Sequence, residues 1–364
     1  MPVPAFEEAA ERLAGLEGTT VKVYPSLCLN LRHRRAGCTA CADCCPTGAV
    51  RWSSELKAEP YDCSQCGACA AACPSGALEM QEPAWQERLA RISRAVREGG
   101  QLLLACPVQV KSDRSLRRRA DLVEVPCIGA VEPWELLAAV TFGAGAVWLL
   151  ESHCSRCSYR PAQALAEGAV QQVRAVLRAW GRSEPVELRH EAPSAPDGGA
   201  RRGLAGLLAR RGVNVQEELA SRGVQVADEG DPEETSPAAG RLPRRVPHSH
   251  RRWIAFLERL GLTASSRPEP CFPEVAVAES CTGCGMCAYF CPTGALQTRE
   301  ESGEIQLLFN ARVCTACGLC ARLCYQKALE IGPGLPQAVL EGQVRQVWRG
   351  QPMNPQERWL SLVR

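Results

Sequence analysis

The sequence predicts a multidomain protein of mixed α+β and α/β class, with a central parallel-sheet α/β domain between two cysteine-rich modules. The chain has 364 residues, which is longer than one average domain. Its 22 cysteines fall into three groups, and the outer two groups repeat each other. Between them, short apolar runs alternate with helix-like stretches, a pattern typical of a parallel sheet.

The same patterns set the expected domain boundaries. We expect an N-terminal helix over 1–23, a first cysteine-rich module over 24–82, an α/β domain over 84–190, a linker rich in Pro and Arg over 191–270, a second cysteine-rich module over 271–332 and a C-terminal tail over 333–364. Short helices are expected in the linker near 201–211 and 251–261.

Composition limits the class of protein. Disulfide scaffolds are small and secreted, whereas this chain is long and its first twenty residues lack the apolar core of a signal peptide, so we expect a reducing cytoplasm. The net charge of +2 gives no argument for nucleic acid or a membrane surface. The longest uncharged run, 136–150, is shorter than the roughly 18 residues of a spanning helix, so no membrane insertion is expected. The arginine doublets Arg201-Arg202 and Arg244-Arg245 are expected on solvated faces.

Cysteine spacing in the outer modules carries the clearest chemical signal. The pattern C-x2-C-x2-C-x3-C-P gives three thiolates to one [4Fe–4S] cluster and the fourth to its neighbour. Three stretches have this spacing: Cys63, Cys66, Cys69 and Cys73; Cys281, Cys284, Cys287 and Cys291; and Cys314, Cys317, Cys320 and Cys324. The last has Tyr325 in place of Pro. Zinc sites use paired ligands instead of such runs, so the spacing favours iron–sulfur clusters. Gly67, Gly285 and Gly318 suit loops that need positive φ.

The first motif is degenerate. Alignment of the CPTG and CPSG endings leaves Arg35 where the first cysteine of the run belongs. Cys28 is favoured as the missing ligand because a loop can bring it back, whereas Cys44 adjoins Cys45 and would have to point the opposite way. If neither binds, the site would hold a [3Fe–4S] centre or keep an open iron. Cys44 and Cys271 are then expected to be buried thiols.

Cross-ligation assigns the cysteines to four [4Fe–4S] clusters. The expected sets are Cys28, Cys38, Cys41 and Cys73; Cys63, Cys66, Cys69 and Cys45; Cys281, Cys284, Cys287 and Cys324; and Cys314, Cys317, Cys320 and Cys291. The stretches 24–80 and 271–332 resemble the two-cluster bacterial ferredoxin family. That resemblance implies two small ferredoxin-like (βαβ)2 modules and electron transfer.

Four more cysteines lie in the expected α/β domain. Cys106, Cys127 and Cys154 each follow an apolar strand, and Cys157 completes a C-x-x-C pair. Carboxyl ends of parallel strands share one edge of a sheet, so these thiols are expected to meet. Spacing alone leaves open a [2Fe–2S] cluster, a zinc site, a catalytic Cys154/Cys157 dithiol and a purely structural role.

A second resemblance bears on this choice. The stretch VPCIGAVEPWELLAAVTFGAGAVWLLESHCSRCSYR, residues 125–160, resembles the delta subunit of methyl-viologen-reducing hydrogenase, over about 85–185. The resemblance favours a [2Fe–2S] cluster. It implies an electron adaptor between a hydrogenase or formate dehydrogenase and a flavin-bearing heterodisulfide-reductase-like subunit. The sequence departs from the family at Cys106, where Pro107 follows and a further cysteine is missing.

Motifs of other enzyme classes are absent from the sequence: it has no Rossmann fingerprint, no P-loop and no nucleophile elbow. We therefore expect an electron-transfer subunit without catalytic residues. The alternative is a redox enzyme that uses the Cys154/Cys157 dithiol, or an open iron, fed with electrons by the other clusters.

Overall fold

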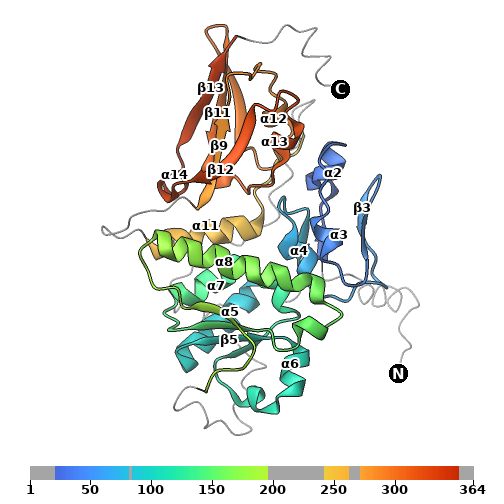
Figure 1. The fold of residues 1–364 in the computed structure, drawn as a ribbon, viewed down its shortest axis with the longest axis vertical. Helices are drawn as coiled ribbons and strands as arrows, with labels where there is room; N and C mark the ends of the chain where they lie inside the picture. Colours follow the sequence, from blue (N-terminus) through green and yellow to red (C-terminus); the bar gives the residue numbers. More distant parts are fainter. Residues whose placement is uncertain (1–20, 82–83, 196–241, 262–270, 352–364) are drawn as a thin grey trace, which may run out of the picture.

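The computed structural model describes residues 21–81, 84–195, 242–261 and 271–351. We call 21–81 the N-module, 84–195 the α/β domain and 271–351 the C-module. Figure 1 shows the C-module and the α/β domain at opposite ends of the long axis, with the N-module beside them. Most of the expected N-terminal helix and the helix candidate at 201–211 lie outside the described residues.

A four-stranded parallel sheet forms the centre of the α/β domain, which confirms the prediction. Its strands are β5 (Leu102–Ala105), β6 (Leu122–Glu124), β7 (Val147–Leu150) and β8 (Val186–Arg189), in the order β6-β5-β7-β8. All four residues of β5 are fully buried. A strand covered on both faces must be apolar throughout, which explains the continuous run LLLA.

Helices cover both faces of this sheet. Leu102 and Leu104 of β5 belong to the core formed with α5 (Trp85–Gly99), α7 (Pro133–Thr141) and α8 (Gln163–Ala179). Leu103 faces the other side, which is covered by α6 (Pro107–Ser112) and a 3-10 turn (Arg114–Arg118). The alternation follows from the two-residue period of a strand.

Helix α11 (His248–Leu260) joins the α/β domain to the C-module (Figure 1). It corresponds to the helix expected near 251–261. Phe256 stacks on Trp134 with a ring-centroid distance of 6.4 Å, and Trp180 meets Phe272 of the C-module edge-on at 5.9 Å. The two parts therefore share one continuous hydrophobic core.

The two cysteine-rich modules have similar architecture. In the N-module, β1 (Val21–Val23) pairs with β4 (Leu78–Met80), and β2 (Val50–Trp52) pairs with β3 (Leu56–Ala58), both antiparallel. Its helices are short: α2 (Leu29–Arg32), α3 (Ala40–Asp43) and α4 (Ala68–Ala72), preceded by a 3-10 turn (Pro25–Leu27).

In the C-module, β9 (Phe272–Val277) pairs antiparallel with β12 (Leu329–Gly334). A second antiparallel sheet joins β10 (Leu296–Glu301), β11 (Glu304–Asn310) and β13 (Val344–Gly350). The short helices are α12 (Met286–Tyr289), α13 (Leu319–Leu323) and α14 (Pro336–Leu340). Strand β13 and helix α14 thus lie in the stretch expected as a tail.

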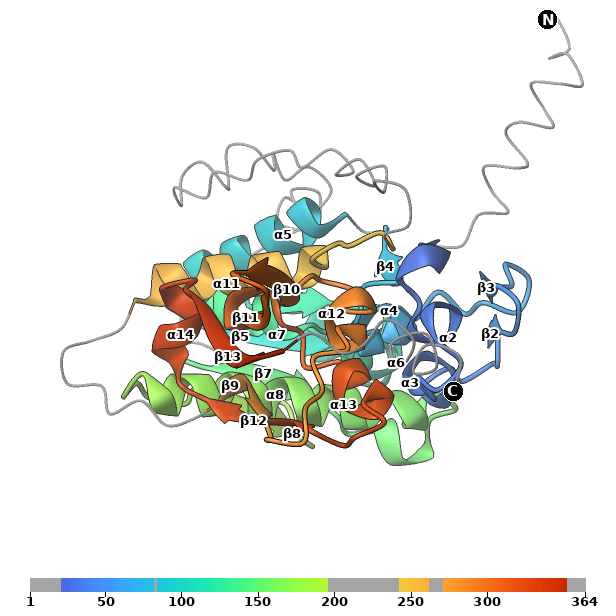
Figure 2. The ribbon, with the colours of Figure 1, turned by 90° about the horizontal axis from the view of Figure 1, so that it is seen from above.

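The N-module and C-module lie side by side, as the view from above shows (Figure 2). Residues 242–247 run between them. The expectation of a solvated face is wrong for Arg245, which is 9% exposed, forms a salt bridge with Glu79 of β4 and lies over the ring of Tyr24. Its charge is buried because a carboxylate and an aromatic ring replace water.

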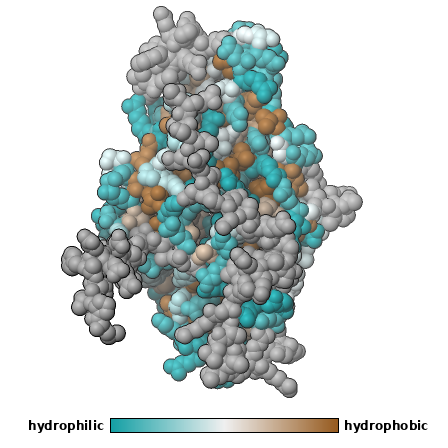
Figure 3. All heavy atoms as spheres, turned by 180° about the vertical axis from the view of Figure 1, so that it is seen from behind, coloured by the Kyte–Doolittle hydropathy of each residue, from teal (hydrophilic) through white to brown (hydrophobic). Residues whose placement is uncertain are grey.

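The opposite side of the molecule shows hydrophobic residues in separate patches among hydrophilic ones (Figure 3). None of the helices that the structure describes combines the length and the apolar character of a membrane span.

Candidate metal centres

Twenty cysteines belong to the five sets expected from the sequence, which we name sites A to E. The sites are A (Cys28, Cys38, Cys41 and Cys73), B (Cys45, Cys63, Cys66 and Cys69), C (Cys106, Cys127, Cys154 and Cys157), D (Cys281, Cys284, Cys287 and Cys324) and E (Cys291, Cys314, Cys317 and Cys320). At sites A and D, all four cysteines of the set line one pocket.

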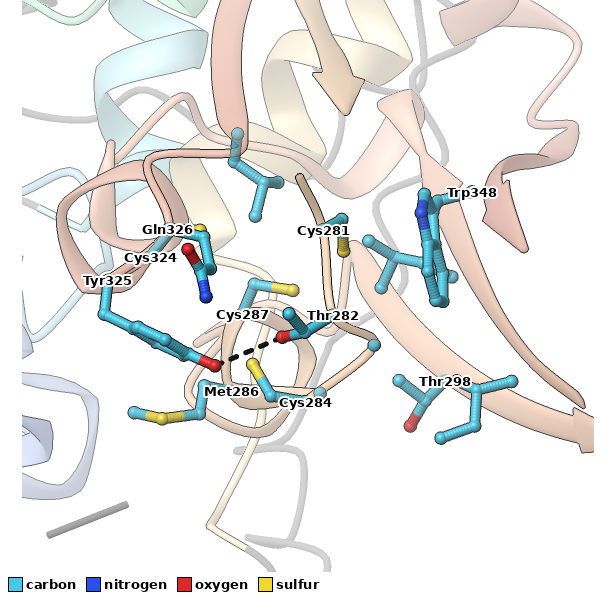
Figure 4. A pocket seen from close by; sticks show the side chains of 15 residues that line it. Cys281, Thr282, Cys284, Met286, Cys287, Thr298, Cys324, Tyr325, Gln326 and Trp348 are labelled. Carbon is cyan, nitrogen blue, oxygen red and sulfur yellow. Dashed lines mark hydrogen bonds between the residues drawn. The ribbon is translucent and has the colours of Figure 1, made fainter. Parts of the chain in front are cut away.

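Site D is a pocket of 440 Å³ in the C-module (Figure 4). All four of its cysteines line the pocket, together with Leu307, Leu329 and Trp348. Cys281, Cys284 and Cys287 come from one loop that runs into α12, whereas Cys324 arrives from the end of α13. The structure therefore brings the fourth cysteine of one run to the first three of the other.

Tyr325, which replaces the proline of the motif, lies at the mouth of site D. Its hydroxyl is 3.2 Å from the hydroxyl of Thr282 (Figure 4). The tyrosine thus connects the loop that carries Cys324 to the loop that carries Cys281.

Site E lies next to site D within the C-module. The pKa of the Cys314 and Cys320 thiols is raised to about 12, mainly by burial and in part by the nearby Cys291. The pKa of Cys287 in site D is raised by its burial and then by Cys284 and Cys320, which places sites D and E side by side.

Site A is a pocket of 320 Å³ lined by all four of its cysteines. The chain brings Cys28 back through Asn30, whose side chain donates to the carbonyl of Cys38 at 2.6 Å and accepts from its N–H at 2.9 Å. Cys44 does not line this pocket. The geometry thus favours Cys28 over Cys44 as the fourth thiol.

Cys44 is 3% exposed and lies between sites A and B. Its pKa is raised to about 12, mainly by burial and in part by Cys41, Cys66 and Cys45. Cys69 of site B has its pKa raised by burial and then by Cys44 and the other cysteines of its site. Cys44 thus packs against site B, although it is not one of the four cysteines expected to bind the cluster there. The other leftover cysteine, Cys271, packs against the large core.

One backbone feature repeats in all four ferredoxin-type loops. The residue before the second cysteine of each run has positive φ: Gly37 at 55°, Gln65 at 58°, Gly283 at 66° and Ala316 at 53°. The degenerate first loop keeps this conformation although Arg35 replaces its first cysteine. The sequence analysis missed this feature, since only two of the four positions are glycine. Gly67, Gly285 and Gly318 have the expected positive φ.

Hydrogen-bond donors surround the fourth cysteine of each run. Backbone N–H groups of Ala77 and Ala328 donate to the sulfurs of Cys73 and Cys324, each at 3.2 Å. Hydroxyl groups lie 3.7 Å from three of these sulfurs, in the pairs Cys45–Thr47, Cys73–Ser75 and Cys291–Thr293. Such donors stabilise negative charge on sulfur and so favour the thiolate form that binds metal.

Site C lies at the carboxyl edge of the parallel sheet, as the strand pattern predicts. Cys106 follows β5 directly, Cys127 follows β6, and Cys154 and Cys157 lie in the turn after β7. Burial raises the pKa of Cys154 to about 12, with Cys106, Cys127 and Cys157 as further causes. His153, beside this site, is exposed.

Sites B and C meet where the N-module packs on the α/β domain. The pKa of Cys127 is raised to about 11, mainly by burial, and among the charges that contribute Cys66 of site B has the largest effect. Gly67 makes the close approach possible, because a Cβ there would lie 3.0 Å from that of Ala130 and 1.7 Å from Cε of Met80.

The donor sets fit iron–sulfur clusters. Every site offers four thiols, and soft thiolates are the ligands that iron–sulfur clusters take. Across the described part of the chain, no three His, Cys, Asp or Glu side chains converge on a single metal ion. At sites A and D the cysteines line pockets with apolar walls.

Comparison with known families identifies three regions. Residues 280–328 match the family model of the 4Fe-4S dicluster domain, and residues 58–79 match that of the 4Fe-4S binding domain. Residues 105–201 match the delta subunit of methyl-viologen-reducing hydrogenase. Two ferredoxin-type iron–sulfur domains therefore flank a hydrogenase delta-subunit-like domain.

Both resemblances predicted from the sequence are confirmed. The match at 58–79 covers the second cysteine run of the N-module and leaves out Cys28, Cys38 and Cys41. No curated protein and no solved structure matches the chain significantly. The three regions together support an iron–sulfur electron-transfer role.

Proposed function

We propose that the chain is a cytoplasmic electron-transfer subunit that holds four [4Fe–4S] clusters at sites A, B, D and E and one [2Fe–2S] cluster at site C. The observation that carries the proposal is the lining of two pockets. At sites A and D, the four cysteines expected from cross-ligation line one pocket, although they come from two separate runs or loops. In this proposal both outer modules are ferredoxin-like (βαβ)2 units.

The residues of the chain have three tasks in this function. They supply thiolates, they exclude water, and they donate hydrogen bonds to sulfur. When bound, iron–sulfur clusters take up and release single electrons at potentials from about −700 to +450 mV, depending on charge, hydrogen bonds and exposure. The N–H groups of Ala77 and Ala328 are such donors, and apolar side chains such as Leu307 and Leu329 keep water from site D.

An electron route between domains follows from the contact of sites B and C. Cys66 and Cys127 lie close enough to affect each other electrostatically, and Gly67 leaves no side chain between the two parts. One electron that leaves a reduced partner at the α/β domain can therefore reach the N-module within the chain. The partner is oxidised by one electron, and the receiving site is reduced by one.

The expected partners follow from the family that the α/β domain matches. We propose a hydrogenase or formate dehydrogenase as one partner and a flavin-bearing heterodisulfide-reductase-like subunit as the other. The match to the delta subunit of methyl-viologen-reducing hydrogenase supports the first.

Electron counting tests this function. The purified, cluster-loaded chain is reduced anaerobically with dithionite, freed of excess reductant and mixed with cytochrome c as a one-electron acceptor. We expect about five electrons per chain, one from each cluster. A chain that accepts and passes on fewer than two electrons would contradict the proposal.

A thiol titration of the same preparation separates a [2Fe–2S] cluster from a dithiol at Cys154 and Cys157. If site C holds the cluster, its four cysteines do not react while the cluster is present. Two thiols at this site that cycle with a disulfide would refute the [2Fe–2S] assignment in favour of the enzyme alternative. The matched control is Cys271→Ala, which removes a cysteine outside all five sites and should lower the total thiol count by one.

A further inference from the structure

A buried arginine lies at the contact between the N-module and the C-module. Arg32 ends helix α2 of the N-module and is 7% exposed. Its guanidinium donates to the carbonyl oxygens of Phe290 at 3.2 Å and Pro243 at 2.7 Å, and to that of Ser26 at 2.9 Å. The side chain of an N-module residue is therefore held among backbone groups of the C-module and the segment before α11.

The charge of this arginine lacks a carboxylate partner within the described residues. Its Nη2 atom is buried and makes no hydrogen bond to any described group. Burial lowers the pKa of Arg32, and the groups with the next largest effects are Cys291, Arg244, Cys317 and Tyr289. Cys291 and Cys317 belong to site E. A second arginine nearby makes the local charge more positive.

A buried cation without a counter-charge is energetically unfavourable. The cysteines that face Arg32 are neutral as thiols and negative as metal-bound thiolates. A cluster held by four thiolates at site E would supply the missing negative charge. The buried Nη2 atom of Arg32, which has no hydrogen-bond partner among the described groups, therefore fits an anionic group at this position.

Site A lies on the other side of the same arginine. The backbone N–H of Arg32 donates to the backbone carbonyl of Cys28 at 2.9 Å. Cys38 of site A and Cys317 of site E pack against one small hydrophobic cluster, which consists of Leu29, Ala36, Leu319 and Leu323. Residues of both modules build this cluster, so sites A and E face each other across the contact.

We propose that Arg32 is a positioning residue that raises the reduction potential of the site E cluster, and that one electron passes directly between sites A and E across this contact. The inference rests on the proposed function. In the step, the donor cluster is oxidised by one electron, the acceptor cluster is reduced by one, and no bond or proton is transferred.

The step places all five sites in one unbranched order. Site C contacts site B through Cys127 and Cys66, and Cys41 of site A raises the pKa of Cys44, which packs against site B. Site A faces site E, and site E adjoins site D through Cys320 and Cys287. In this proposal the order is C, B, A, E, D.

Replacement of the charge tests the role of Arg32. In Arg32→Gln, we expect the equilibrium constant for reduction of the site E cluster to fall at least tenfold, which is a shift of 59 mV to lower potential. An EPR-monitored redox titration measures this shift. Arg32→Lys should restore at least half of it, because the positive charge returns.

Two controls isolate burial and position. Arg51→Gln removes an exposed arginine of the N-module that pairs with Asp62 and should leave the potential of site E unchanged. Arg322→Gln removes an exposed arginine that donates to the carbonyl of Cys317, and water should screen its effect to less than that of Arg32→Gln. An Arg32→Gln potential equal to wild type, or a larger shift in Arg322→Gln, would overturn the inference.

A second experiment does not depend on the folding of the arginine variants. Cys41→Ala removes a ligand of site A, and Cys63→Ala removes a ligand of site B in the same module. If sites A and E are neighbours, the electron-spin relaxation of the reduced site E cluster slows in Cys41→Ala and stays as in wild type in Cys63→Ala. Equal relaxation in both variants overturns the direct A-to-E step. Loss of the proposed function itself is distinguishable, since the wild type would then lack the cluster signals altogether.

Discussion

Cys28 and Cys44 offer a direct test of how site A is built. Both thiols are buried and belong to the same hydrophobic cluster. Cys28 lines the 320 Å³ pocket with Cys38, Cys41 and Cys73, whereas Cys44 does not. Cys28→Ala should therefore remove a ligand, and Cys44→Ala should remove only a packed sulfur.

The expected magnitudes differ clearly. Four [4Fe–4S] clusters and one [2Fe–2S] cluster contain about eighteen irons. In Cys28→Ala the count should fall by about four if the cluster is lost, or by about one if a [3Fe–4S] centre remains. In Cys44→Ala the iron count should stay unchanged, and the free energy of unfolding should fall by about 1 kcal/mol for the lost packing.

The assay is iron and acid-labile sulfide per chain, together with EPR of the reduced protein. Both variants are purified and reconstituted in parallel with wild type. Loss of four irons in Cys44→Ala with a full count in Cys28→Ala would refute the geometry of site A. A full count in both variants would show that Arg35 leaves the site with three cysteine ligands.

Three further changes test the loops and the module contacts. Anaerobic denaturation of Gly67→Ala should show a free energy of unfolding lower by about 1–2 kcal/mol because of the positive φ, and by about 1–3 kcal/mol more because of crowding. Gly48 has a similar φ but open space around it, so Gly48→Ala should show only the loss of about 1–2 kcal/mol. Ala316→Gly should stabilise the C-module by about 1 kcal/mol, because glycine tolerates the φ of 53°, and a lower denaturation midpoint would contradict the strain argument. Burial alone would raise the pKa of Glu79, but hydrogen bonds and charges from His248 and Arg245 lower it below the usual value. The Glu79 carboxylate therefore stabilises the fold above the unfolded pKa of about 4.3, and this stabilisation is lost as pH falls. The difference in denaturation midpoint between wild type and Glu79→Gln should therefore narrow below about pH 4. A difference that does not change with pH would contradict the ion-pair explanation.

Local patterns predicted the parts of the fold that depend on local chemistry. The parallel sheet was predictable because β5 is apolar at every position, as a strand buried on both faces must be. Site C was predictable as a group, since cysteines that follow parallel strands share one edge. The sequence favoured Cys28 as the fourth thiol of site A but did not fix it. The position of Cys28 near Cys38 depends on two hydrogen bonds that the side chain of Asn30 makes, and no sequence motif signals these bonds.

Contacts between distant segments were not predictable from the sequence. Arg245 belongs to a doublet that reads as solvated, yet it pairs with Glu79, which lies 166 residues earlier in the chain. Arg32 likewise contacts a distant segment, since its guanidinium donates to the backbone carbonyl of Phe290. Strand β13, which lies in the stretch expected to be a tail, pairs with β11. The two arginines are held by contacts between segments far apart in the chain, and β13 is held by strand pairing within the C-module. Local periodicity carries no information about either kind of contact.

The central claim is that the chain holds four cubane clusters and one two-iron cluster. The most direct measurement is the iron and acid-labile sulfide content of the wild-type protein, with spin quantitation by EPR after full reduction. We predict about eighteen irons and eighteen sulfides per chain. About sixteen irons with one zinc would contradict the [2Fe–2S] assignment at site C, and about eight irons or fewer would contradict the account as a whole.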